Sequence, residues 1–100
     1  MAHEILLGLQ VSDDALYTRY REAMAPMLAL AGGAFRFDFQ VAAVLKKQTE
    51  APINRVFAIR FPDRAAKERF FTDPAYLAVR ERFFTASVEA VTVLSEYEVP

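Results

Sequence analysis

Apolar and polar residues alternate along four segments of the chain, which predicts four β-strands. In the first segment, Glu4–Val11, every odd position is apolar. The second, Ala34–Leu45, divides into an apolar face and a polar face: Phe35, Phe37, Phe39 and Val41 against Arg36, Asp38 and Gln40. The remaining two strands are predicted over Arg55–Phe61 and Ala90–Val99. A period of two is typical of strands because successive side chains point to opposite faces of the sheet.

Helical segments separate these strands and are marked by their capping residues. Ser12-Asp13-Asp14 supplies side-chain acceptors for the first turn of a helix, and Gly32-Gly33 permits the left-handed conformation that ends it. Spacings of three and four predict one buried face on this helix, formed by Leu16, Tyr20, Met24, Met27 and Ala31. Arg21 falls outside that face and is expected in solvent. Farther along the chain, Asp63 is the expected cap of a second helix. Thr72 or Asp73 is the expected cap of the next, with Pro74 in its first turn.

The order strand, helix, strand, strand, helix, strand predicts one α+β domain over residues 1–100. A chain of 100 residues is the usual size of a single domain. This order matches the ferredoxin-like βαββαβ arrangement, in which a four-stranded antiparallel sheet has the strand order 4-1-3-2 and helices on one face. The opposite sheet face then has no helix to cover it.

The uncovered sheet face predicts a homodimer that forms through the sheet. Its expected members are Leu6, Gly8, Val56, Ala58, Thr92 and Leu94, among the charged or amide side chains of Glu4, Gln10, Arg36, Asp38, Gln40, Arg60 and Glu96. Such a face is too apolar for easy solvation and too charged for a monomer core, so two copies should close on each other. A face that is simply wet is the alternative. On this face we expect Asp38 opposite Arg60, where the pair would set strand register and dimer specificity.

Composition and charge exclude several classes of function. The net charge of −1 shows no basic footprint for nucleic acid, and no apolar stretch is long enough for a membrane span. There is no cysteine, so disulfides, zinc–thiolate sites and thiol nucleophiles are excluded. The start of the sequence has no basic segment followed by an apolar run, so no secretory signal is predicted and a cytoplasmic location is expected. We expect no metal and no cofactor.

Few residues can carry chemistry. His3 is the single histidine. It is interpreted as a residue near a frayed terminus or at the start of the first strand or, alternatively, as a general base near a subunit boundary. Haem is not expected because His3 is poorly placed as an axial ligand. The candidate ligand-binding residues are two arginines around a carboxylate, and tyrosines between helix and sheet: Arg36, Asp38, Arg60, Tyr17 and Tyr20. The charged group could hold an anionic ligand or be a structural ion pair. The tyrosines, with Tyr76, are either core residues or the lining of a cleft.

A family resemblance joins several of these features. Gly32-Gly33 precedes an aromatic strand, Arg55–Ile59 leads into Phe61-Pro62, and Ala66 and Phe70 are followed by Asp73-Pro74-Ala75-Tyr76. With Tyr17, Tyr20 and the proline of the first helix, this pattern resembles the domain of unknown function 1330 family over nearly the whole chain, most closely over 54–84. The resemblance implies a dimeric α/β barrel, in which two ferredoxin-like subunits pair through their sheets.

The resemblance does not imply one activity. Its superfamily contains cofactor-independent monooxygenases, haem-degrading enzymes and small-molecule isomerases, and the fold does not choose among them. The family usually has a basic residue and glycines near Asp38, an acidic residue where Arg60 stands, and a tryptophan near Phe70 or Phe71. The leading hypothesis is a homodimer that binds a small organic molecule. The alternatives are a cofactor-independent monooxygenase or isomerase that acts on an aromatic or carbonyl compound, and a non-catalytic assembly or stress-related protein.

Overall fold

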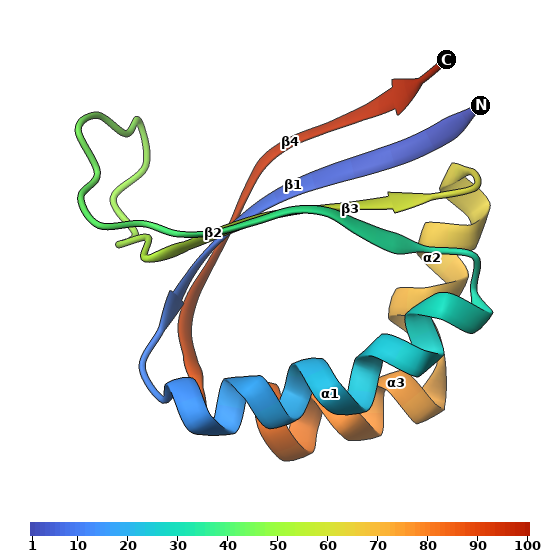
Figure 1. Cartoon of the computed structure of the whole chain (residues 1–100), viewed down its shortest axis with the longest axis horizontal. Coiled ribbons are helices and arrows are strands. Elements are labelled where there is room, and N and C mark those ends of the chain that lie inside the picture. Colours follow the sequence, from blue (N-terminus) through green and yellow to red (C-terminus); the bar gives the residue numbers. More distant parts are fainter.

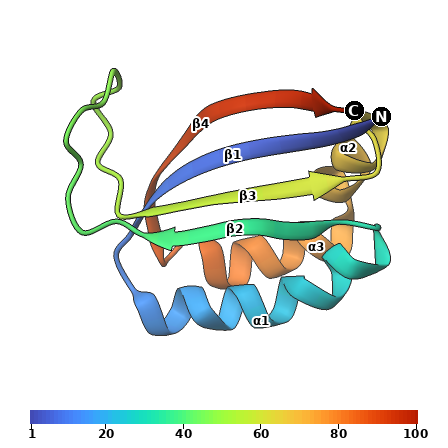
Figure 2. The same ribbon diagram turned by 45° about the horizontal axis from the view of Figure 1, so that its top comes forward.

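The computed structural model describes all residues 1–100 and contains one sheet with helices on one side (Figures 1 and 2). The elements follow in the order β1 (Ala2–Val11), α1 (Asp14–Leu30), β2 (Ala34–Gln40), β3 (Arg55–Phe61), α2 (Arg64–Thr72), α3 (Pro74–Val79), the π-helix η1 (Arg80–Phe84) and β4 (Val88–Val99). The four strands are antiparallel in the order β2-β3-β1-β4, which is the predicted order 4-1-3-2 counted from the opposite edge of the sheet. The predicted α+β ferredoxin-like fold is therefore confirmed. None of the helices is both long and apolar enough to cross a membrane.

The expected helix boundaries are confirmed at their caps. The carboxylate of Asp13 accepts a hydrogen bond from the backbone N–H of Leu16 at 3.0 Å, and Asp63 caps α2 in the same way. Asp73 caps α3, and Pro74 occupies its first turn. Gly32 follows α1 with a φ of 78°, a conformation that costs glycine little. These ends are set locally, so each could be predicted without knowing the fold.

The core lies between the helices and the sheet, and Phe61 is its most enclosed residue with 0% exposure. The buried face of α1 is rotated from the predicted one: Tyr17, Tyr20, Met24 and Leu28 are buried. Leu16, Met27 and Ala31 are only half-buried. Both sets fit a helical period, so periodicity alone did not distinguish them. Tertiary packing decides which face of α1 is buried, because Tyr20 packs against Tyr76 of α3 and Phe84 of η1.

A bulge in β2 changes which face its side chains occupy. Phe35 lies opposite Ile59 and Phe37 opposite Ala58, so Arg36 is an extra residue between them. Beyond it, the alternation is reversed: Phe37 and Phe39 point to the uncovered face, and Asp38 turns toward the helices. The predicted position of Asp38 opposite Arg60 is wrong, because the register of the hairpin places Ala34 opposite Arg60 and Asp38 opposite Phe57. The bulge accounts for the change of face, since one extra residue reverses the alternation of every later side chain.

Two further predictions about strands are corrected. Strand β2 ends at Gln40 instead of Leu45, and residues 41–54 form the loop that projects from the sheet in Figure 1. In β4 the partner shifts between Leu6 and Leu7, which places Glu96 opposite Ile5 on the helix side. Glu96 was expected on the uncovered face. Here too, an irregularity of a single residue reversed the period-two pattern.

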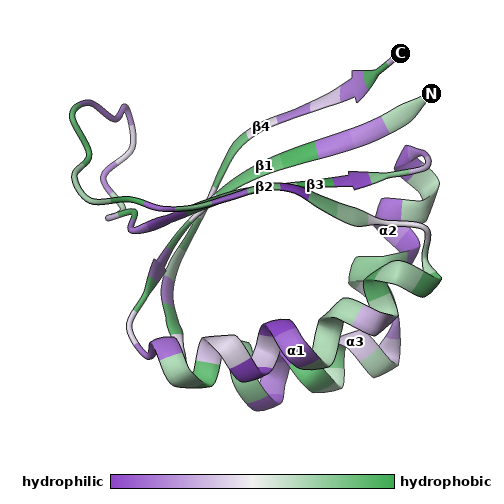
Figure 3. Ribbon diagram, in the orientation of Figure 1, coloured by the Kyte–Doolittle hydropathy of each residue, from purple (hydrophilic) through white to green (hydrophobic).

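The corrected uncovered face is more apolar than the sequence predicted. Phe37 and Phe39 are both 54% exposed and stack with their ring centroids 6.0 Å apart. Hydrophilic residues are grouped instead toward the end of β1 and β3 nearest the chain termini (Figure 3). There Glu4 accepts a hydrogen bond from Arg60 at 3.2 Å and another from the hydroxyl of Tyr97. Arg60 thus pairs with β1, and not with Asp38 on β2.

Candidate functional site

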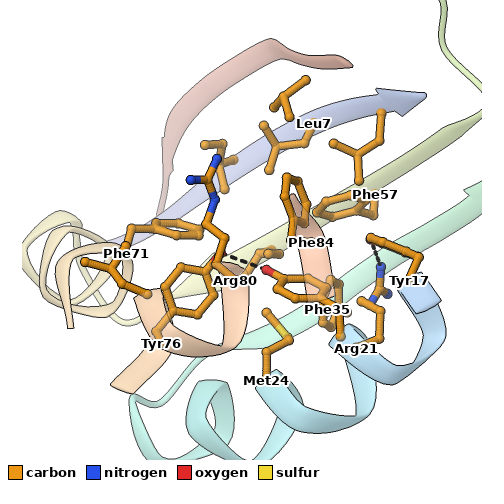
Figure 4. A pocket seen from close by; sticks show the side chains of 16 residues that line it. Leu7, Tyr17, Arg21, Met24, Phe35, Phe57, Phe71, Tyr76, Arg80 and Phe84 are labelled. Carbon is orange, nitrogen blue, oxygen red and sulfur yellow. Dashed lines mark hydrogen bonds between the residues drawn. The ribbon is translucent and has the colours of Figure 1, made fainter. Parts of the chain in front are cut away.

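A cavity of about 280 Å³ lies between the helices and the sheet. Its lining comes from all four strands and from α1, α2, α3 and η1 (Figure 4): Ile5, Leu7, Leu9, Tyr17, Tyr20, Arg21, Met24, Phe35, Phe57, Ile59, Phe71, Tyr76, Leu77, Arg80, Phe84 and Val91. Hydrophobic side chains make up 14 of these 16 residues. The exposed members, Leu77, Arg80 and Val91, define its mouth beside α3, η1 and β4. The cavity is therefore an apolar space with a small number of polar atoms.

A pair of tyrosine hydroxyls forms the first polar feature of the lining. The hydroxyls of Tyr20 on α1 and Tyr76 on α3 are 2.7 Å apart, and their side chains are almost fully buried. Burial raises the pKa of both hydroxyls, so both stay protonated near neutral pH. One hydroxyl donates to the other, and the second proton has no acceptor in the protein. That remaining O–H group can donate a hydrogen bond to a ligand.

A second polar feature is a closed network of two arginines, one carboxylate and one tyrosine. Asp38 accepts two hydrogen bonds from Arg55, at 2.8 and 2.9 Å, and one from Arg21 at 2.8 Å. Arg21 also donates to the hydroxyl of Tyr17, and its guanidinium lies 3.7 Å from the ring centre of Phe35. The hydrogen bonds of Arg55, followed by the charges of Arg21 and Arg55, lower the pKa of Asp38 despite its partial burial. The network thus joins α1, β2 and β3 through hydrogen bonds among its own members.

Arg80 is the third polar feature and differs from Arg21. It begins the π-helix η1, a rare conformation that often occurs at functional sites. Its side chain is at the mouth, and its guanidinium lies 5.1 Å from the ring centre of Phe84. Arg80 takes part in none of the ion pairs of the chain. It is therefore a cation beside an apolar cavity that has no carboxylate to neutralise it.

The structure brings some of the predicted site residues together. Tyr17 and Tyr20 line the cavity, and Asp38 contacts its wall through Arg21. Arg36 and Arg60 do not line it. The predicted cluster of Arg36, Asp38 and Arg60 does not form. The arginines that contact Asp38 are Arg21 and Arg55, because the bulge turns Asp38 to the helix side. Whether the predicted residues bind a ligand stays a prediction.

Sequence reasoning did not identify Arg80 as a site residue. The one available signal was its position three residues after Leu77 and four before Phe84, which puts a cation on the same helical face as two apolar residues. Many surface arginines have such neighbours, so this spacing alone does not single one out.

His3 lies outside the cavity, in a separate polar cluster. It is 5% exposed at the beginning of β1, and its Nε2 is 2.7 Å from a carboxylate oxygen of Glu96, which also contacts Lys67. Its Nδ1 is buried without a hydrogen-bond partner. His3 is thus a packed strand residue, as the first interpretation expected. It has no access to the cavity as a general base.

Comparisons with known proteins agree on the fold. The sequence model of the domain of unknown function (DUF1330) matches residues 5–97. No curated protein matches. A protein of unknown function from Rhodopseudomonas palustris is similar in structure, with a TM-score of 0.82, 17% identity and coverage of 99% of this chain and 82% of the other.

Two further solved structures show how widely this fold is used. A dimeric ferredoxin-like protein of unknown function from Jannaschia sp. CCS1 has a TM-score of 0.58 and 20% identity, with coverage of 99% and 100% of the two chains. The hydroxynitrile lyase of Passiflora edulis has a TM-score of 0.69 and 12% identity, with coverage of 99% and 94%. At these identities the likeness establishes the fold and leaves function to the site itself.

Proposed function

The chain belongs to the domain of unknown function 1330 (DUF1330) family, a membership that names no activity, and from its site we propose that it binds a small organic molecule as a homodimer. The observation that carries this proposal is the apolar cavity with a free hydroxyl donor from the Tyr20–Tyr76 pair and a cation, Arg80, at its mouth. Small-molecule sites are typically concave and apolar, with a few polar groups that orient the ligand.

The size of the cavity limits the ligand. A dry cavity of about 150 Å³ accommodates benzene. The cavity here, at about 280 Å³, therefore has room for one aromatic ring with a side chain of several atoms. Larger cofactors such as haem exceed this volume. The ligand that fits best is a substituted monocyclic or small bicyclic compound.

Homodimer formation is supported by the uncovered sheet face. Phe37 and Phe39 expose more than half of their surface side by side on this face, and Leu94 and Tyr97 on β4 are also exposed. Contiguous exposed apolar side chains on a folded protein mark interaction surfaces. A similar solved structure is described as a dimeric ferredoxin-like protein. A second copy of the chain that covers this face through its own sheet accounts for these observations.

An enzymatic role is the second candidate, and the hydroxyl pair is the observation that favours it. A buried O–H donor can polarise a carbonyl group, and the fold also occurs in a hydroxynitrile lyase. However, the cavity lining contains no carboxylate, imidazole, thiol or amine that could act as a general base. The lining is thus better equipped to bind and orient a molecule than to remove a proton from it.

Ligand binding can be tested by calorimetry and thermal shift with a panel of small aromatic compounds. Leu77→Trp should weaken binding at least about tenfold, because the larger side chain occupies the mouth of the cavity. Leu30→Trp is the matched control, since Leu30 is 92% exposed on α1 and does not line the cavity. If no compound binds, or if both variants behave alike, the proposed binding function is wrong.

The homodimer requires a separate test by sedimentation equilibrium. Replacement of both Phe37 and Phe39 by Ser should shift the protein from dimer to monomer, because it removes the largest exposed apolar pair from the sheet face. Leu30→Ser, which removes an exposed apolar side chain on the helix layer, should leave the dimer intact. A monomeric wild-type protein at micromolar concentration contradicts the proposal.

A further inference from the structure

The two arginines of the cavity lining have different electrostatic states. The charge of Arg21 is balanced by Asp38 at 2.8 Å, and its donors are also used by Tyr17. Arg80 has no carboxylate partner and lies at the mouth, where its guanidinium keeps its donors free. A guanidinium fork matches the geometry of a carboxylate and binds it through two parallel hydrogen bonds. The cavity thus has one vacant position for an anionic group, and that position is at its entrance.

The hydroxyl pair offers a complementary position deeper in the cavity. Tyr20 and Tyr76 share one hydrogen bond, which leaves one buried O–H proton without an acceptor. An O–H group without an acceptor in the protein gains a hydrogen bond when a ligand brings an oxygen to it. Because Tyr76 is on α3 and Arg80 begins the next turn, the free donor and the free cation lie close together (Figure 4). The charge of Arg80 also acts on the Tyr76 hydroxyl.

From this arrangement we propose that the ligand is an aromatic oxo acid. Its carboxylate binds to Arg80 at the mouth, its oxo group accepts the free hydrogen bond of the Tyr20–Tyr76 pair, and its ring fills the apolar cavity. This inference rests on the proposed binding function and specifies the chemical class of the ligand. A cationic ligand is excluded because no carboxylate in the lining would compensate it. A polyhydroxylated ligand is excluded because its hydroxyls would find too few partners among 14 hydrophobic residues.

Four related probes separate the charge from the oxo group. Benzoylformate has a ring, an oxo group and a carboxylate, and its methyl ester lacks only the negative charge. Phenylacetate keeps the charge and lacks the oxo group, and methyl phenylacetate lacks both. Dissociation constants are measured by calorimetry with the full chain. Wild-type protein should bind benzoylformate about tenfold more tightly than its ester, and about fivefold more tightly than phenylacetate.

Two variants then assign each preference to its residues. Arg80→Gln should abolish the preference for the acid over the ester. Arg82→Gln is the matched control, because Arg82 belongs to the same π-helix but does not line the cavity. The double change Tyr20→Phe and Tyr76→Phe removes both hydroxyls and leaves neither one unpaired. It should abolish the preference for the oxo group and retain the preference for the acid.

The outcomes distinguish this inference from the proposed function. If none of the four probes binds while other aromatic compounds of the panel do, the assignment of an oxo acid is wrong and the proposed binding function stands. If no compound of the panel binds either, the proposed binding function is refuted. If all four bind with equal affinity, the cavity binds aromatic molecules but the assignment of an oxo acid is wrong. The assignment is also wrong if the acid preference survives in Arg80→Gln or is lost equally in Arg82→Gln. Thermal unfolding of each variant in the absence of ligand verifies that it is folded.

Discussion

Replacement of Asp38 by Ala tests the main structural correction, namely that this carboxylate lies on the helix side of the sheet. In the structure it accepts hydrogen bonds from Arg55 and Arg21, whose side chains are 18% and 16% exposed. Without Asp38, two partly buried guanidinium groups would remain side by side with no counter-charge. We therefore expect a clear loss of stability, in contrast to the small effect of an ordinary surface carboxylate.

The magnitude follows from burial. Loss of one partner from a fully buried ion pair costs about 3–5 kcal/mol. The side chain of Asp38 is 31% exposed, so water screens part of this interaction and the expected loss is about 2 kcal/mol. The bidentate contact with Arg55 should account for more of it than the single contact with Arg21.

The dependence on pH has a defined sign. The pKa of Asp38 in the folded protein is below its ordinary value of 3.8, chiefly because Arg55 donates hydrogen bonds to the charged form. The stabilisation by Asp38 is therefore fully present above that ordinary value and is lost as the pH falls through the folded pKa. The difference in stability between the wild type and Asp38→Asn should be constant near neutral pH and should shrink in acid.

The assay is urea unfolding of double-mutant cycles at one fixed protein concentration. Asp38→Ala is combined in turn with Arg55→Met, Arg21→Met and Arg60→Met. Coupling free energies of about 1.5 and about 1 kcal/mol are expected for Arg55 and Arg21, and less than about 0.5 kcal/mol for Arg60. A coupling with Arg60 as large as that with Arg55 would refute the observed pairing of β2 with β3 and restore the register predicted from the sequence.

Three further changes test other parts of the fold by urea unfolding. Phe61→Ala should cost about 3–5 kcal/mol, because Phe61 is 0% exposed and its loss leaves a cavity; a cost below about 1 kcal/mol would contradict the packing. Gly32→Ala should cost more than about 1 kcal/mol, because φ is +78° and the new Cβ would lie 2.7 Å from Cγ of Pro62; a neutral effect would show that this turn is not left-handed. Glu4→Gln should destabilise at neutral pH but not in acid. The hydroxyl of Tyr97 and then Arg60 lower the pKa of Glu4, so its stabilisation is lost below its ordinary value of 4.5; an effect that persists in acid would argue against an ionic contribution.

Local features of the sequence determined the order of the elements and most of their ends. The carboxylates of Asp13, Asp63 and Asp73 accept hydrogen bonds from free N–H groups of a helix that lie within three residues. Gly32 itself adopts the positive φ of the turn that follows α1. These interactions act over a few residues and depend little on the remainder of the chain. For the same reason, strand β3 was predicted with its correct bounds from its alternating pattern.

Only the tertiary structure decided which side chains meet. The bulge at Arg36 depends on how β2 pairs with β3, and a single extra residue there moved Phe37 to the uncovered face and Asp38 to the helices. A period-two pattern assumes an uninterrupted strand, so the sequence alone could not show this reversal. The contact between Tyr20 and Tyr76 joins residues 56 positions apart, and no local pattern encodes it.

The candidate site shows the same division. The sequence indicated that tyrosines and arginines were the residues able to bind a ligand or take part in chemistry, because so few other candidate groups were present. It could not indicate which arginine keeps a free charge, since that depends on which carboxylate lies nearby in space. Asp38 neutralises Arg21 and Arg55, and Arg80 is left without a partner at the mouth of the cavity. Residue types are a property of the sequence, whereas a vacant binding position arises only when distant segments pack together.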